Sequence, residues 1–202
     1  MPRYICNSNY CGTEFKKPNK MEMVYQGEIE IVDVCPGCDG YSFRVYGMIY
    51  GFVGSGKFKD KEFVIKKLND IINPEVDIIV SGHSPRNKKN NVDIWSEDWA
   101  NEFCWTKPII HPADENNKKE YFRRNKKIAQ DSDKLVCFIN KGRYKSGTWN
   151  TIKHFVNKPD FNLNNLIIYN EEHKLWKTDD LPKWILRKMK FIENMKRVSG
   201  LF

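Results

Sequence analysis

Two pairs of closely spaced cysteines near the N-terminus constrain this chain more than any other feature. Cys6 and Cys11 are separated by four residues, and Cys35 and Cys38 by a Pro-Gly dipeptide. Tight turns that carry thiolates in this way aim their sulfurs at one point and form a tetrahedral metal site. The spacing predicts a small β zinc ribbon over residues 1–42, in which these four cysteines hold a structural Zn²⁺ ion.

The chemistry of the four cysteines leaves two alternatives open. The turn at Cys35 also resembles a rubredoxin knuckle, which would hold iron, and free thiols are the other alternative. Four protein ligands leave no open coordination position, so the metal is expected to stabilise the fold rather than to catalyse. We expect Gly37 to supply a positive φ angle in the second turn.

The distribution of cysteines indicates the cellular compartment, and the net charge indicates the kind of partner. Clustered cysteines, with Cys104 and Cys137 in apolar surroundings, favour a reducing cytoplasm over a secreted disulfide framework. No run approaches the roughly 18 apolar residues that span a bilayer, so no membrane partner is expected. A net charge of +8 over 202 residues favours anionic partners such as phosphates, nucleotides or nucleic acid, the alternative being a solvated lysine-rich surface.

After residue 42, apolar runs alternate with amphipathic stretches. The expected strands are 45–53, 76–81, 107–111, 134–140 and 165–169, and the expected helices are 61–72, 92–103, 118–130 and 148–156. Strands that are apolar throughout suit a parallel sheet covered on both faces. This predicts an α/β fold: a Rossmann-like three-layer domain with a mostly parallel sheet over 43–172, followed by a basic helical tail over 173–202.

Small and polar residues follow four of the expected strands. Ligands bind outside the carboxyl ends of parallel strands, so these residues form the candidate ligand site. In chain order they are Gly54, Ser55, Gly56 and Lys57, then Ser81, Gly82 and His83, then Asp114, and finally Ser146, Gly147 and Thr148. Thr148 is expected to cap a helix whose first amides face an anion, while Arg124 adds a charge and Asn125 fixes a neighbouring loop.

These segments resemble, in order, the motifs of the SLOG superfamily, which unites Smf-type DNA-processing proteins with lonely-guy phosphoribohydrolases. The similarity is to the small YspA-like branch and covers about residues 45–170. The matching segments are Gly54-Ser55-Gly56-Lys57, Ser81-Gly82-His83, Val92-Asp93 with Trp99-Ala100, Pro112-Ala113-Asp114, Arg124-Asn125, Ser132-Asp133-Lys134-Leu135 and Gly147-Thr148. The resemblance implies a nucleotide-binding domain and places Asp93 among the ligand contacts.

The departures from that pattern bear on catalysis. Gly56 stands where the branch has arginine, and His83 stands where it has a second glycine. The glutamate that phosphoribohydrolase relatives carry after their Gly-Thr pair is missing at its expected place. Proton transfer would then fall to Asp93, Glu97 or Asp114, of which Asp93 and Asp114 are the candidate catalytic residues.

Three functions follow as hypotheses. The first is binding or sensing of a nucleotide or nucleotide-derived ligand, and the second is hydrolysis of an N-glycosidic or phosphate bond in such a ligand. The third is nucleic-acid binding by the basic insertion 85–91, the tail and the ribbon, with Trp95 or Trp149 available for stacking. Related domains often pair through helices, so a homodimer is a further expectation.

Overall fold

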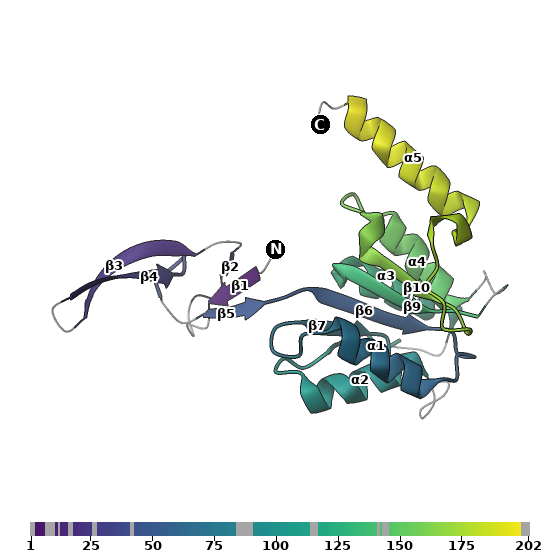
Figure 1. The fold of residues 1–202 in the computed structure, drawn as a ribbon, viewed down its shortest axis with the longest axis horizontal. Helices are drawn as coiled ribbons and strands as arrows, with labels where there is room; N and C mark the ends of the chain where they lie inside the picture. The colour runs from purple at the N-terminus through teal and green to yellow at the C-terminus, as the bar shows by residue number, and fades with distance from the viewer. Residues whose placement is uncertain are drawn as a thin grey trace.

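The computed structural model describes residues 3–6, 11, 13–15, 18–25, 28–40, 43–83, 91–113, 117–140, 142 and 146–198 (Figure 1). The strands are β1 (Arg3–Cys6), β2 (Glu14–Phe15), β3 (Asn19–Tyr25), β4 (Glu28–Val34), β5 (Phe43–Tyr46), β6 (Ile49–Gly54), β7 (Ile78–Ser81), β8 (Ile109–Ile110), β9 (Lys134–Phe138) and β10 (Leu166–Tyr169). The helices are α1 (Lys61–Ile71), α2 (Val92–Phe103), α3 (Lys118–Asp131), α4 (Gly147–Val156) and α5 (Lys183–Val198).

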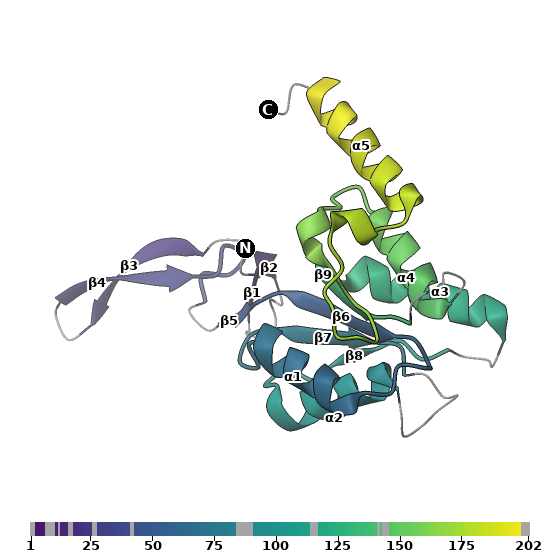
Figure 2. The ribbon, with the colours of Figure 1, turned by 45° about the vertical axis from the view of Figure 1, so that its right-hand side comes forward.

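Five strands form a parallel sheet in the order β10-β9-β6-β7-β8. Helices α1 and α2 cover one face of this sheet and α3 and α4 cover the other (Figures 1 and 2). The predicted α/β fold with a largely parallel sheet is therefore confirmed. The chain runs outward from β6 through β7 to β8 and then returns to the other side of β6 for β9 and β10. The strand order thus reverses between β6 and β9.

The apolar core lies on both faces of the sheet. Along β9, Leu135 and Cys137 pack into the cluster that contains α3 and α4, whereas Val136 and Phe138 pack into the cluster with α1 and α2. Both sets of side chains are fully buried. A strand covered in this way has no polar face, which explains why its sequence is apolar from Leu135 onward.

Side-chain caps fix where the four main helices begin. Asp60, Asn91, Asn117 and Ser146 precede α1 to α4, and each side chain accepts a hydrogen bond from the backbone N–H three residues on. These caps satisfy amides that have no partner inside the helix. The cap of α4 is Ser146 rather than the predicted Thr148, so that α4 begins one residue earlier than expected.

The N-terminal strands form two small sheets. β1 pairs antiparallel with β2 and with β5, and β3 pairs antiparallel with β4 in a hairpin that extends to the left in Figure 1. The single strand expected over 45–53 is therefore two strands, because β5 joins the ribbon sheet and β6 joins the parallel sheet. Val24, Ile29 and Ile31 of the hairpin are largely exposed.

A buried carboxylate accounts for the break between β5 and β6. Asp77 Oδ1 accepts a hydrogen bond from the Met48 backbone N–H at 2.6 Å, and Asp133 Oδ2 accepts one from the Ile49 N–H at 3.0 Å. A Cβ atom at Gly47 would collide with the Asp77 side chain, so only glycine fits at this bend. The two carboxylates hold the start of β6 in place.

Helix α5 packs only part of its length on the domain. Ile185 is fully buried in the α3 and α4 cluster, and the Trp184 ring lies against Trp149 with centroids 6.5 Å apart. Phe191, further along the helix, is 57% exposed. Among the described helices, none is long and apolar enough to cross a membrane.

Candidate functional site

The four N-terminal cysteines meet at one point, as their spacing predicts. Their Sγ atoms all lie within 4.8 Å of one another. The Cys6 and Cys38 sulfurs are 3.5 Å apart, those of Cys11 and Cys35 are 3.7 Å apart, and no disulfide links them. Tetrahedral thiolate ligands at about 2.3 Å from zinc lie about 3.8 Å from one another. The cluster therefore has the donor set and the spacing of a four-thiolate metal centre.

Hydrogen bonds from neighbouring residues reach two of these sulfurs. The Gly37 backbone N–H donates to Cys35 Sγ at 3.3 Å, and the Thr13 hydroxyl lies 3.0 Å from Cys11 Sγ. Hydrogen bonds from Thr13 lower the pKa of Cys11 to about 6, whereas, despite the opposing effect of a hydrogen bond from the Gly40 backbone, bonds with Cys11 and Cys6 raise the pKa of Cys38 to about 12, so the first negative charge of the cluster is favoured on Cys11. The prediction of a positive φ at Gly37 is wrong, since Asp39 takes that conformation at φ 55°. Gly37 is required for another reason: a Cβ there would lie 2.6 Å from the Thr13 hydroxyl.

The other two cysteines lie outside the cluster. Cys137 is fully buried, and burial raises the pKa of its thiol well above the usual value. Cys104 is only partly buried, but desolvation still raises its pKa to about 11. Both thiols stay protonated near neutral pH, which agrees with their interpretation as packing residues.

A cavity of about 470 Å³ opens at the carboxyl ends of β6 and β9. This is the point where the strand order reverses, and open α/β sheets bind ligands there because adjacent loops diverge. Nine of the predicted site residues line the cavity. They are Gly54, Ser55, Gly56, Asp93, Arg124, Asn125, Ser146, Gly147 and Thr148.

The remaining predicted residues fall elsewhere. Lys57, Ser81, Gly82 and His83 are absent from the described lining of the cavity. Two of them bond residues that line it, since the Gly82 carbonyl accepts from Arg124 and Ser81 Oγ donates to the Asp93 carbonyl. Asp114 lies outside the described residues.

One wall of the cavity is formed by helix α3, and a prediction based on the residues that follow strands does not include it. Lys118, Tyr121 and Ile128 of α3 line it, together with the already predicted Asn125. These four residues are spaced by three, four and three positions, which places them on one face of a helix. That periodicity is the signal in the sequence from which this wall could be found. Asn91, which caps α2, is a further lining residue that was not predicted.

Arg124 is fixed in the cavity wall by contacts on three sides. Its Nη2 donates to Asn125 Oδ1 at 3.2 Å, its Nη1 donates to the Gly82 carbonyl at 3.2 Å, and its guanidinium lies 5.1 Å from the centre of the Tyr121 ring. Asn125 Nδ2 in turn donates to the Gly147 carbonyl at 3.2 Å. These bonds link the first residue of α4 to the turn after β7.

Thr148, in the first turn of α4, has an unusual environment. It is 4% exposed and lines the cavity. Its Oγ1 is one of two buried side-chain oxygens without a hydrogen-bond partner in the part of the chain that the structure describes, the other being Asn140 Oδ1. A buried hydroxyl without a partner costs roughly 1–3 kcal/mol, so such groups usually face a ligand or ordered water.

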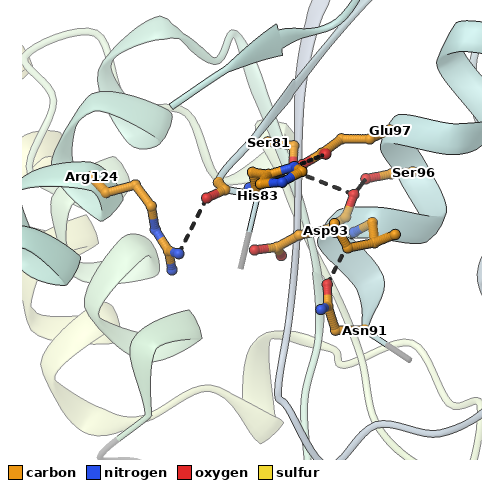
Figure 3. Close-up of polar contacts among 9 residues, drawn as sticks. Ser81, His83, Asn91, Asp93, Ser96, Glu97 and Arg124 are labelled. Atoms are coloured by element: carbon orange, nitrogen blue, oxygen red, sulfur yellow. Dashed lines mark hydrogen bonds and ion pairs between the residues drawn. The ribbon is translucent and has the colours of Figure 1, made fainter. Parts of the chain in front are cut away.

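Two carboxylates on α2 have contrasting surroundings (Figure 3). Glu97 accepts hydrogen bonds from Ser81 Oγ at 2.5 Å and from the His83 backbone N–H at 2.9 Å, and its Oε2 lies 2.6 Å from His83 Nδ1. Asp93, one turn earlier, is buried in the cavity wall. Desolvation raises the pKa of Asp93 to about 6 despite the opposing effects of Arg124 and His83.

No family model, curated protein or solved structure matches this chain.

Loss of the cysteine cluster should disorder the ribbon and spare the cavity. In a variant with Cys35→Ser and Cys38→Ser, we expect the residues before about position 42 to become sensitive to limited proteolysis, because metal binding supplies their folding free energy. The cavity lies at the carboxyl end of β6, a strand whose six residues alone span about 20 Å, so its ligand affinity should not change. Cys104→Ser is the control. If the residues around the cavity became as sensitive to proteolysis as the ribbon, the result would show that the ribbon supports the cavity.

Asp93 should make stability depend on pH. The folded chain binds the Asp93 proton more tightly than the unfolded chain does. The stability that this proton contributes is complete below pH 4 and is lost as the pH rises through about 6. Asp93→Asn should therefore raise the free energy of unfolding by up to about 3 kcal/mol at pH 8, with a gain that shrinks toward pH 4. Urea unfolding at several pH values measures it.

The matched control is Asp98→Asn, which changes an exposed carboxylate on the same helix. A gain for Asp93→Asn that is the same at every pH would contradict the assignment.

Proposed function

We propose that the cavity binds a nucleotide or nucleotide-derived ligand, as the SLOG-like motifs imply, with the phosphate at the N-terminus of α4. One observation carries this proposal: α4 begins in the cavity wall, and the buried hydroxyl of Thr148 in its first turn has no partner among the described residues. A phosphate oxygen is an acceptor that this hydroxyl and the adjacent backbone amides can meet together.

The charges near α4 favour an anion. The first amides of a helix have no acceptor inside the helix and carry a partial positive charge. Lys118 and Arg124 add two cationic side chains to the same cavity. On the opposite side, no atom lies within 4 Å of a Cβ position at Gly56, so the turn after β6 leaves room for the ligand.

The rest of the lining suits a sugar and a base. Val53, Tyr121, Phe122 and Ile128 supply apolar and aromatic surface, and Phe122 is 43% exposed. A cavity of this volume falls within the range of small-molecule sites, and an apolar wall beside a few polar groups is their usual composition. A phosphate at one end and an aromatic base at the other would use both parts of the wall.

We also propose that the metal held by the four cysteines is Zn²⁺ rather than iron. The first cysteine pair has a longer spacer than a rubredoxin knuckle, and no redox partner site accompanies it among the described residues. Elemental analysis of the purified protein should give one zinc per chain and a colourless solution. A visible absorption band that disappears on reduction would instead identify iron bound by thiolates.

Ligand titration tests the proposal for the cavity. Calorimetry with nucleoside 5′-monophosphates, NAD and ADP-ribose should show binding by at least one of them. Thr148→Val removes the hydroxyl with little change of shape and should weaken that binding by about 10-fold to 100-fold, the value of a hydrogen bond to a charged group.

Thr106→Val, a partly exposed threonine outside the cavity lining, is the control and should leave the dissociation constant unchanged. Absence of binding by every compound in the series, or equal binding by the Thr148 variant, would reject the proposal.

A further inference from the structure

The β3–β4 hairpin carries an exposed apolar face. Val24, Ile29 and Ile31 are 73%, 70% and 68% exposed, respectively. The register places them on one face with Glu22, because Val24 pairs with Ile29 and Glu22 pairs with Ile31 two residues along the strands. These four residues form the hairpin face. A two-stranded hairpin is only marginally stable by itself in water, and a contiguous exposed apolar patch usually marks an interaction surface.

The same hairpin is acidic. Its two strands carry four carboxylates and one lysine, and that lysine, Lys20, is in an ion pair with Asp33 at 2.6 Å. Glu22, Glu28 and Glu30 therefore have no cation on the hairpin to neutralise them, and all three are exposed. Neighbouring strands lie about 4.8 Å apart, less than the Debye length of about 8 Å, so an occupant of the hairpin face also experiences the carboxylates of the other face.

Helix α5 carries a surface of complementary character. Trp184 and Phe191 are 37% and 57% exposed, and they lie two turns apart on one side of the helix. Arg187 and Lys188 lie between them in the sequence, and the Lys188 Nζ atom is 5.5 Å from the centre of the Phe191 ring. These four residues form the α5 stripe. The helix contains six cationic residues and one glutamate, so its exposed side is aromatic and basic where the hairpin is aliphatic and acidic.

The hairpin face and the α5 stripe do not meet within one chain. Figures 1 and 2 show the hairpin and α5 projecting from different sides of the molecule. A second copy can bring each surface to the other. Packing of two hairpins on each other is disfavoured, because it would place the uncompensated carboxylates of both copies side by side. The complementary charges therefore favour contact between the hairpin of one copy and α5 of another.

The size of the contact favours a reciprocal arrangement. Each surface presents four side chains, far fewer than the roughly 20–30 residues on each side of a stable interface. One such contact would be weak, and repeated head-to-tail it would build an open chain of molecules. A two-fold pair makes the same contact twice and closes the assembly at two copies.

We propose that two copies of this chain form a two-fold dimer in which the hairpin face of each copy packs on the α5 stripe of the other. The aliphatic side chains of the hairpin cover Trp184 and Phe191, and Glu22 lies near Arg187 and Lys188. Both surfaces lie outside residues 45–170, which carry the SLOG-like motifs, so the dimer depends neither on that resemblance nor on a ligand in the cavity.

Sedimentation equilibrium of the full chain, as purified with its metal, tests the dimer. At about 100 µM, well above the micromolar range of transient contacts, we expect a particle of twice the 23.9 kDa chain mass. Ile29→Ser with Ile31→Ser should raise the dissociation constant at least 10-fold, because two buried aliphatic groups are lost. The dimer should also weaken in 1 M NaCl, where the Debye length falls to about 3 Å.

Exchange of charges between the two surfaces is the decisive experiment. Glu22→Lys with Glu30→Lys makes the hairpin basic, and Arg187→Glu with Lys188→Glu makes the α5 stripe acidic. Each double variant alone should be monomeric, because like charges then face each other. An equimolar mixture of the two should dimerise, since each altered surface then meets an altered partner and each unaltered surface an unaltered one. Mixing cannot restore a variant that has failed to fold, so recovery reports on the interface itself.

Two controls match these substitutions. Lys61→Glu with Lys66→Glu reverses two exposed charges on α1, and Trp105→Ser removes a ring that is 75% exposed just beyond α2. Both should leave the dissociation constant unchanged. A monomer at about 100 µM in low salt would overturn the proposal. It would also be overturned by a dimer that survives either charge-reversed pair, by a mixture that stays monomeric, or by a dimer that only Trp105→Ser disrupts.

Discussion

The parallel central strand β6 is the constraint on which the rest of the structure depends. With strands on both sides and helices over both faces, it has no surface on which a polar side chain can meet water. The chain can extend the sheet from β6 in only two directions, and it uses both in turn. The reversal between them separates the loops after β6 and β9, and the cavity forms in that gap.

Much of this fold could be predicted because the signals are local. Apolar runs such as Leu135–Phe138 indicate buried parallel strands, and capping residues such as Asn91 and Asn117 mark helix starts in the sequence itself. The break before β6 could not be predicted, since it depends on carboxylates of Asp77 and Asp133 that lie far away in the chain. The positive φ angle at His83 is likewise supported by a contact that is distant in the chain, since its backbone N–H donates to Glu97 Oε1.

The residues of the candidate site likewise fall into those that local signals predict and those that depend on tertiary contacts. Residues that follow strands, such as Ser55 and Gly147, were predicted from topology alone, whereas the α3 wall around Tyr121 was missed because its residues lie within a helix. The roles of the α2 carboxylates could not be assigned from sequence. Glu97 and Asp93 are four residues apart, yet one is surrounded by three hydrogen-bond donor groups and the other is mainly desolvated. Only the packing of β7 against α2 distinguishes them.

The passage of the chain from β5 into β6 has a consequence for access. The cysteine cluster belongs to the ribbon, whose strand β5 leads into the amino end of β6 (Figure 1), and the cavity is lined by residues at the carboxyl end of β6. A macromolecule that held the ribbon would leave the mouth of the cavity open to solvent, so tethering and exchange of a small ligand do not compete for the same space. The central strand would then act as a spacer, because its six residues span about 20 Å between the ribbon side and the cavity.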